Sequence, residues 1–585
     1  METCEDNKGM NEPLLNTPSK LQGGLRTLPF ILANEGFERA AFYGLEPNMI
    51  VYLMGNYGLE MATGSNILFL WAAATNFTPI LGAFLADSYV GRFPMIAFGS
   101  IFSLLGTMLL WSTTMIPGAT PYKFESVANT NPSPTPFQLI LLFSSFGLMS
   151  IGTGGIRSST LAFGADQIAR NGVDENAKPN CVGLLESFFN WYYFSVSISV
   201  LFGLTCVVYI QDHAGWQAGF GVPTLLMLLS VVSFFLASSF YVKVKPPKAS
   251  LLTGFAQVIV ASWRNRHYEF PSELNVDKVY HVVKGSTLEF PSEKLRSLNK
   301  ACIVMDPRQD LTPDEMVVDP WRLCTIDQVE DFKSIINLIP LWSTGIMMGV
   351  HANTTSFRVL QAFSMDRHIL TPTFEIPPGS FGTFGLITLM FWLILYERVI
   401  IPMASKVMGK PVRLHVMTRM GIGLLLSFAC LLVSGIVESI RRDMATKGEI
   451  LEDKTSSTVP MSALWLVPQV CLFCLAEAFS AIAQIELFYS EFPKSMSSIA
   501  SNLQGLGMGI ASLFASLIIT VVDCVTKKFG KESWVSSDIN KGHYDYYYWI
   551  LAGLSLLNYI YFLFCSKAYE QGKRDLQDTK GISDA

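Results

Sequence analysis

Residues 28–54 read LPFILANEGFERAAFYGLEPNMIVYLM. The segment is long enough to cross a hydrocarbon layer of about 30 Å, which takes roughly 20 helical residues. It nevertheless carries Glu35, Glu38 and Arg39, and spacings of three and four residues put these side chains on one helical face. Because each such charge costs at least about 3 kcal/mol in lipid, the charged face is expected to line a protein cavity. The segment predicts a membrane-spanning helix with a buried ionisable cluster.

Apolar segments of similar length recur along the chain. Half of the 585 residues are hydrophobic and 15% are charged, against about 25% charged residues in typical soluble domains. The first six candidate spans cover 28–54, 66–88, 93–112, 137–163, 184–209 and 219–242. Six more cover 333–363, 379–403, 415–438, 461–489, 497–524 and 546–567. The sequence therefore predicts an all-α protein of the lipid bilayer, with 12 transmembrane helices in two six-helix bundles.

A polar segment separates the two sets of spans. Residues 243–332 carry charges of both signs and several prolines, so they are predicted to form a linker without a hydrophobic core of its own. The predicted parts are an N-terminal tail at 1–27, a first bundle at 28–242, the linker at 243–332, a second bundle at 333–567 and a C-terminal tail at 568–585.

Positive charges predict the orientation. In the first half, the loops at 55–65 and 211–218 hold no Lys or Arg, whereas the segments on the opposite side carry several. Positive charge marks the cytoplasmic side, so both tails and the linker are predicted to be cytoplasmic. The second half follows the rule less well, because Arg441 and Arg442 fall on the opposite side.

Composition and motifs exclude several classes of function. The net charge is -5 and no dense basic tract is present, so no nucleic-acid partner is expected. The ten cysteines are scattered and lack metal-binding spacing. No HExxH, GxSxG or other catalytic spacing occurs, so the chain is not expected to be an enzyme. We expect no metal and no cofactor, with a proton gradient as the driving force.

The cluster of Glu35, Glu38 and Arg39 has two interpretations. Two carboxylates around one guanidinium can take up and release a proton while the total charge stays nearly balanced, as proton coupling requires. The same residues could instead form a fixed ion-pair cluster that holds helices together. The residues alone leave both interpretations open.

Further charges lie in or beside the predicted spans. The segment GTGGIRSS at 152–159 puts Arg157 beside a glycine-rich, easily distorted stretch of the fourth span. Glu477, an isolated acid in the tenth span, is the best candidate for its counter-charge. This pair could be a permanent salt bridge between the halves or one that substrate or proton breaks. Asp87 and Arg92, at the end of the second span, are predicted to pair across a short turn and to set gating geometry.

His351 lies in the seventh span, in the segment MGVHANTT at 348–355. A lone histidine in a span is more often a packed core residue, and physical chemistry alone favours that interpretation. A histidine with its usual pKa of about 6.5 could also bind an anion when it is protonated.

Three motifs together carry a resemblance to a known family. They are ExxER at 35–39, the 152–159 segment followed by FGADQ at 163–167, and Glu477 ahead of QIELFY at 484–489. Over about residues 26–570, the chain resembles the plant nitrate and peptide transporter group of the proton-coupled oligopeptide transporter family, within the major facilitator superfamily.

The resemblance implies a major facilitator fold and proton symport. In such a protein ExxER couples protons, and Arg157 pairs with Glu477 or meets an anionic group of the substrate. His351 falls where nitrate-transporting relatives place a substrate-binding histidine. Tyr43 and Thr354 are assigned with it to the substrate site.

The predicted function is proton-coupled symport of a small anion, nitrate first, by alternating access. The alternatives are symport of an organic anion, a plant hormone, a glucoside or a di- or tripeptide, and a transporter-like nutrient sensor. The expected partners are the anion, protons and lipid, and the expected location is the plasma membrane. A homodimer stays open.

Overall fold

The computed structural model describes residues 23–583 except for 122–132, 170–177, 244–250, 269, 271–279, 283–289, 306–309, 313–316, 370–373, 411–413, 452–457, 493–496 and 529–531. Most of the predicted N-terminal tail, 1–27, lies outside the described residues. Regular structure in the described residues is nearly all helical. The two described strands, β1 (Met365–Asp366) and β2 (Val459–Ser462), form one short parallel pair.

The helices follow one another in two sets separated by the linker. The first set is α1 (Leu28–Leu45), α2 (Met49–Tyr57), α3 (Met61–Leu85), η1 (Ala86–Val90), α4 (Arg92–Met115), α5 (Pro136–Ala169), α6 (Lys178–Phe202), η4 (Gly203–Val207) and α7 (Val208–Leu236). The linker contains α8 (Leu251–Arg264) and η6 (Arg296–Cys302). The second set is α10 (Ile326–Ser343), α11 (Ile346–Ala352), α12 (Thr355–Phe363), η7 (Pro378–Phe381), α13 (Gly382–Leu395), η8 (Tyr396–Ile400), α14 (Ile401–Met408), α15 (Val416–Leu451), η9 (Ala463–Leu466), α16 (Val467–Glu491), α17 (Ser497–Lys527) and α18 (Tyr544–Ser583).

These helices cross the membrane twelve times. Nine described helical runs are long and apolar enough to span it, and one of them, Ser187–Leu236, has 50 residues. That run turns at Gly215, whose φ is 77°, and so makes two crossings. The nine runs therefore give ten crossings. The pair of α10 and α11–α12, which is bent by 46°, gives the eleventh. The twelfth is α1 with α2, whose charged residues keep it out of a purely apolar count. The predicted all-α fold with twelve spans is confirmed.

Two spans that the sequence predicted as single helices are broken. The first is interrupted between α1 and α2 at Pro47, which lacks a backbone N–H and cannot continue the helical hydrogen bonds. The seventh begins at Ile326 rather than near residue 333, because Thr325 and Gln328 form a capping box. It is then interrupted between α10 and α11 and between α11 and α12.

The two bundles repeat one packing pattern. In the first, α4 packs against α5 and α7, and in the second α15 packs against α16 and α18. The second and eighth spans each contain a π-helical turn, η1 and η8. This internal repeat is the usual architecture of secondary transporters, in which one half moves against the other.

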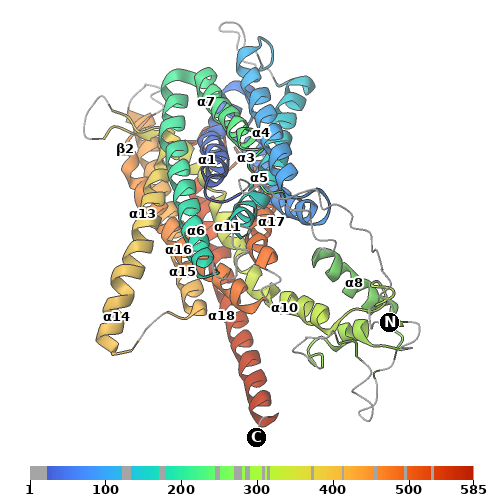
Figure 1. Ribbon diagram of the computed structural model, residues 1–585. Coiled ribbons are helices and arrows are strands. Elements are labelled where there is room, and N and C mark those ends of the chain that lie inside the picture. Colours follow the sequence, from blue (N-terminus) through green and yellow to red (C-terminus); the bar gives the residue numbers. More distant parts are fainter. Residues whose placement is uncertain are drawn as a thin grey trace, which may run out of the picture.

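Among the described residues, hydrophobic packing between the two bundles is concentrated at one end of the molecule. Figure 1 shows the linker with α8 at one end of the molecule; we call this the linker end and the opposite one the far end. At the far end a single hydrophobic cluster includes Tyr52 and Trp71 of the first bundle and Ala511 of the second. Toward the linker end, the described clusters contain residues of one bundle, with contributions from the linker. The structure is therefore closed at the far end.

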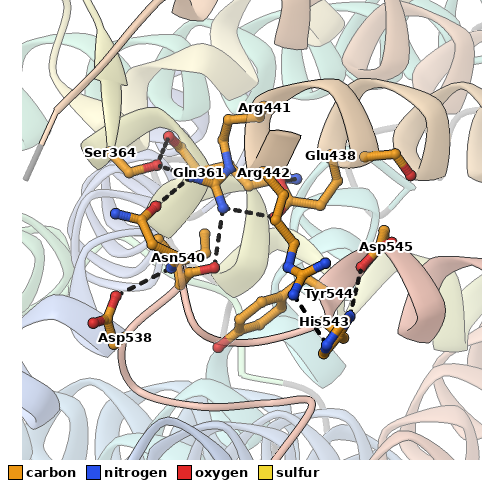
Figure 2. Close-up of polar contacts among 12 residues, drawn as sticks. Gln361, Ser364, Glu438, Arg441, Arg442, Asp538, Asn540, His543, Tyr544 and Asp545 are labelled. Atoms are coloured by element: carbon orange, nitrogen blue, oxygen red, sulfur yellow. Dashed lines mark hydrogen bonds and ion pairs between the residues drawn. The ribbon is translucent and has the colours of Figure 1, made fainter. Parts of the chain in front are cut away.

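A buried charge network stabilises the far end of the second bundle (Figure 2). Arg441 of α15 is fully buried and lies 2.8 Å from Glu438, and it also donates to Asn540 Oδ1 at 2.8 Å. Gln361 of α12 donates to the same Glu438 at 2.7 Å. Arg441 is thus a packed residue within the protein. Its paired state explains why counting it as a loop charge gave a poor orientation signal in this half.

The linker does contain a small hydrophobic core, contrary to the sequence prediction. Val258 and Ala261 of α8 pack against Ala301 and Cys302 of η6 and against the start of α10. Burial raises the pKa of the Cys302 thiol to about 12, so this thiol is neutral and packs as an apolar group. The many charged residues of the linker obscured the amphipathic pattern of the short helix α8 in the sequence.

Candidate functional site

The charged face of α1 is buried inside the first bundle. Arg39 Nε donates to Glu35 Oε1 at 2.9 Å, and its Nη2 lies 2.8 Å from the same oxygen. Tyr192 of α6 donates its hydroxyl to Glu35 Oε1 at 3.1 Å. The second carboxylate oxygen, Oε2, is buried without a hydrogen-bond partner. Glu35 is therefore paired on one oxygen and free to accept on the other.

Glu38, one turn along α1, faces α5. Thr153 donates to Glu38 Oε1 at 3.1 Å, and Arg157 donates through Nε to Oε2 at 3.3 Å. Arg39 Nε lies 3.8 Å from Glu38 Oε2. Two carboxylates and two guanidinium groups thus form one balanced cluster, which we call the charge quartet: Glu35, Glu38, Arg39 and Arg157.

Close helix packing positions the quartet. Asn34, next to Glu35, donates to Ser100 Oγ of α4 at 2.9 Å and to Ser230 Oγ of α7 at 2.8 Å. On α5, a Cβ at Gly152 would lie 2.3 Å from the backbone nitrogen of Ser103, so only glycine permits this approach to α4. The segment 152–159 is regular helix in the structure. Its glycines serve close packing rather than distortion.

A cavity of about 250 Å³ lies between the two bundles. From the first bundle it is lined by Tyr43, Glu46, Pro47, Val200 and Leu204. From the second it is lined by Thr355, Arg358, Val359, Pro378, Gly379, Phe381, Gly382, Leu386, Leu389, Val470, Phe473, Cys474 and Glu477. The wall is mainly apolar, with a few polar and charged groups set into it. Such a cavity between repeats is where secondary transporters hold their substrates.

The predicted ion pair between Arg157 and Glu477 is not formed in this structure. Arg157 Nη2 lies 3.1 Å from Glu38 Oε1, within its own bundle. Glu477 lines the cavity and has no ion-pair partner among the described residues. The nearer carboxylate on α1 takes the arginine, because α1 and α5 pack directly against each other.

His351 and Thr354 do not line the cavity. The His351 ring is buried, with Nδ1 2.8 Å from Ser427 Oγ and Nε2 3.5 Å from Cys430 Sγ. Thr354 is buried as well and donates its hydroxyl to the backbone oxygen of His351 at 2.8 Å. Both residues are packed inside the second bundle in this conformation. Of the predicted substrate residues, Tyr43 lines the cavity.

Asp87 and Arg92 lie near the linker end of the second and third spans. Arg92 Nη2 lies 3.3 Å from Asp87 Oδ1 across the turn at Gly91. Arg92 Nη1 lies 2.7 Å from Asp166 Oδ2 on α5. One arginine thus ties the ends of three spans together within the first bundle.

Sequence reasoning missed four charged or polar residues of this region. Tyr192 was not among the predicted site residues, although its hydroxyl donates to Glu35. Glu46 and Arg358 are charged residues inside predicted spans, and the rule that such charges are costly would have singled them out. Asp166 stands in the FGADQ segment, which marked the family but suggested no contact.

Comparisons with known proteins agree with this architecture. A family model described as POT family matches residues 93–535. Protein NRT1/ PTR FAMILY 1.2 of Arabidopsis thaliana is 50% identical over 558 residues, which cover 95% of this chain and 91% of that protein. Protein NRT1/ PTR FAMILY 1.1 of Arabidopsis thaliana is 50% identical over 567 residues, covering 97% and 94%.

Solved structures show the same fold. The crystal structure of the POT family transporter PepTSo matches with a TM-score of 0.67 at 18% identity, covering 93% of this chain and 98% of that one. An auto inhibited POT family peptide transporter matches with the same TM-score and identity, covering 93% and 97%. The predicted major facilitator fold is therefore confirmed. The chain belongs to the POT family of proton-coupled transporters, and within it to the NRT1/PTR group.

Proposed function

We propose that the protein is a symporter that moves an anionic solute together with protons by alternating access. The observation that carries the proposal is the charge quartet, in which two buried carboxylates face two guanidinium groups. Fixed pairing alone is a weak reason to bury four charges, because apolar residues of similar volume often stabilise a protein as well or better. Proton uptake and release at this site would explain why the protein keeps four charges in the membrane.

The contacts suggest how a proton would act. Protonation of Glu38 would remove the charge that balances Arg157 and leave that guanidinium net positive. The Arg157 guanidinium lies 5.9 Å from the ring centre of Tyr43, which lines the cavity. A proton taken up by the quartet would therefore make the cavity more attractive to an anion. The anion and the proton would enter together because each neutralises the other's charge.

Nitrate is the first candidate for the anion, on the strength of the segment 350–355. In the present contacts both His351 ring nitrogens have protein partners, so nitrate binding there would require the ring to leave Ser427 or Cys430. An organic anion is the second candidate, because the cavity volume of about 250 Å³ equals that of roughly eight water molecules. Nitrate would leave most of that space to water.

We also propose that the carrier lies in the plasma membrane. The positive charges of the first half predict that both termini are cytoplasmic. A homodimer is compatible with it. A nutrient sensor that keeps the fold but moves little solute is the alternative, and it would show binding without uptake.

Currents in expressing oocytes test the coupling. Substrate-evoked inward current should be larger at pH 5.5 than at pH 7.5, and Glu38→Gln should abolish it at equal surface expression. A mutant current equal to that of the wild type would rule out the coupling role of Glu38.

Nitrate uptake tests the first candidate separately. His351→Ala should abolish uptake of labelled nitrate if the ring binds the ion. Unchanged nitrate uptake in this variant would rule out the nitrate assignment, and competition by organic anions would favour the second candidate.

A further inference from the structure

Arg358 of α12 is a cavity residue without a counter-ion. It lines the cavity between the bundles together with Glu46 and Glu477. Its Nη2 donates to Thr355 Oγ1 at 2.8 Å, whereas its Nη1 is buried and has no hydrogen-bond partner. No carboxylate of the described residues forms an ion pair with it. A buried guanidinium donor left without a partner costs roughly 1–3 kcal/mol, so this group is expected to have a ligand in another state.

Other arginines within the two bundles contrast with Arg358. Arg39 is paired with Glu35, Arg157 with Glu38 and Arg441 with Glu438, each at 3.1 Å or less. Their charges are compensated by residues of the same bundle. The guanidinium of Arg358, a residue that lines the cavity, has no such compensation.

Two contacts hold the Arg358 side chain in place. Thr355 begins α12 after the break that follows α11, and its hydroxyl also donates to the backbone oxygen of Ala352 at 2.9 Å. The Phe473 ring lies 5.4 Å from the Arg358 guanidinium carbon. The group is therefore oriented before any ligand arrives, which reduces the entropy that binding would cost.

We infer that Arg358 anchors the carboxylate of an organic anion whose apolar body fills the cavity. The inference deepens the proposed function and rests on it, because it develops the second candidate, an organic anion, and assigns it a binding residue. A guanidinium presents parallel N–H donors that match the two oxygens of a carboxylate. Nitrate has similar oxygens, but it has no apolar part that could contact the apolar wall formed by residues such as Leu204, Leu386 and Phe473.

Charge balance ties this site to protons. The titratable groups that line the cavity are Tyr43 of α1, Glu46 directly after α1, Arg358 of α12, and Cys474 and Glu477 of α16. His351 of α11 contacts the ring of Phe473. With both glutamates ionised, the three full charges of the wall sum to -1. An anion therefore binds better once Glu46 or Glu477 is protonated, so binding strengthens as the pH falls.

Calorimetric titration of the purified full-length protein tests the inference. The probe is phenylacetate, with phenylacetamide as its neutral analogue and acetate as the carboxylate without an apolar body. At pH 5.5 the wild type should bind phenylacetate more tightly than acetate and should not bind phenylacetamide. Arg358→Gln should weaken phenylacetate binding roughly 10- to 100-fold, as expected when a charge-assisted hydrogen bond is lost.

Two further variants show whether weaker phenylacetate binding by Arg358→Gln comes from the loss of the guanidinium. Arg358→Lys keeps the charge but loses the paired donors, so its affinity should fall between those of the wild type and Arg358→Gln. Arg398 is exposed on η8, away from the cavity lining, and Arg398→Gln should bind as the wild type does. Size-exclusion profiles of all variants check that each is folded.

Each contrary outcome is informative. Equal phenylacetate affinity in wild type and Arg358→Gln, equal binding of phenylacetamide, or no phenylacetate binding by the wild type would overturn the inference. The proposed function fails by a different result, the absence of acid-stimulated current with any anion. Currents that persist while Arg358→Gln binds normally would refute the anchor and leave the symporter in place.

Discussion

Glu35 is held by one charged and one neutral neighbour, and these two contacts have different effects. Arg39 compensates its charge through a contact of 2.8 Å. Tyr192 adds a hydrogen bond of 3.1 Å that stabilises the ionised form more than the protonated one. The tyrosine therefore adds a neutral hydrogen-bond donor without changing the total charge of the quartet.

Tyr192→Phe should shift transport to less acidic conditions. Loss of the hydroxyl removes about 1 kcal/mol of stabilisation from the carboxylate, so the pH of half-maximal current should rise by up to about one unit. The measurement is substrate-evoked current between pH 5 and pH 8. Tyr193 follows in the chain and is exposed, so Tyr193→Phe is the matched control. Equal profiles for both variants would show that the Tyr192 hydroxyl has no such effect.

The helical period predicted which residues of the quartet share a face, but it could not predict their partners. Glu35, Glu38 and Arg39 follow from spacing alone, because they lie within two turns of one helix. The pairing of Arg157 with Glu38 depends on how closely α1 and α5 approach, which is a tertiary property. His351 was ambiguous for the same reason, since its contacts with Ser427 and Cys430 come from α15.

Among the elements, α5 shows how small residues set helix distance. A Cβ at Gly152 would lie 2.3 Å from Ser103 N and 2.7 Å from Gly99 O, both backbone atoms of α4. Neither atom can rotate away, so the two helices would have to separate. The Thr153 and Arg157 contacts to Glu38 would move with α5.

Gly152→Ala should therefore destabilise the protein, whereas Gly147→Ala should not. Gly147 lies on the same helix, and a Cβ there meets no atom within 4 Å. Alanine at that position should be neutral or stabilising by up to about 1 kcal/mol, because it favours helix. At Gly152 the forced separation should cost about 1–3 kcal/mol, as for an overpacked core. Thermal unfolding in detergent measures both, and equal melting temperatures would contradict the packing account.

The segment between α17 and α18 contains His543, which lies between Arg442 and Asp545 (Figure 2). His543 Nε2 lies 3.0 Å from Arg442 Nη2, and its Nδ1 lies 3.8 Å from Asp545 Oδ1. Burial and the charge of Arg442 lower the pKa of His543 below its ordinary value of 6.5, against the opposing effect of Asp545. The folded state therefore favours the neutral ring. Its contribution to stability is complete above about pH 6.5 and is lost as the pH falls through the folded-state pKa.

Acidification should loosen this segment. Between pH 7 and pH 5, hydrogen exchange of residues 534–543 should rise beyond the intrinsic pH effect, because protonated His543 repels Arg442. His543→Gln keeps an acceptor for Arg442 but does not titrate, so the extra exchange should disappear. His415 is an exposed residue before α15, and His415→Gln should behave as the wild type. Extra exchange that persists in His543→Gln would point to another titrating group.

In the whole molecule, hydrophobic contacts contribute most of the free energy that keeps the far end closed, and ion pairs contribute little. The hydrophobic cluster that contains Tyr52, Trp71 and Ala511 spans both bundles. The ion pairs Glu60–Lys527 and Asp212–Arg367 cross the same boundary at 2.7 and 3.4 Å, but their side chains are partly exposed. Exposed pairs contribute about 0.2–1 kcal/mol each, so they adjust the closed state rather than create it.

The sequence predicted two bundles and their spans, but it could not predict which end is closed. Hydropathy is the same in every state of an alternating-access carrier, because the helices move as rigid groups. The closed end depends on residues far apart in the chain, such as Asp212 and Arg367. Each of those contacts is weak, and no local sequence pattern predicts it.

Asp212→Asn should favour opening of the far end by a small, salt-dependent amount. Loss of one exposed pair should change the ratio of open to closed molecules roughly 1.4- to 5-fold at low salt, and high salt should remove the difference. Distances between spin labels on the far-end loops after α4 and before α16 measure this ratio. Arg367 also contacts Glu375 at 2.8 Å within the second bundle, so Glu375→Gln removes a pair of the same arginine without crossing the boundary. Of these two pairs of Arg367, the one with Asp212 joins the bundles, so an equal shift in both variants would mean that the cross-bundle pair does not govern closure.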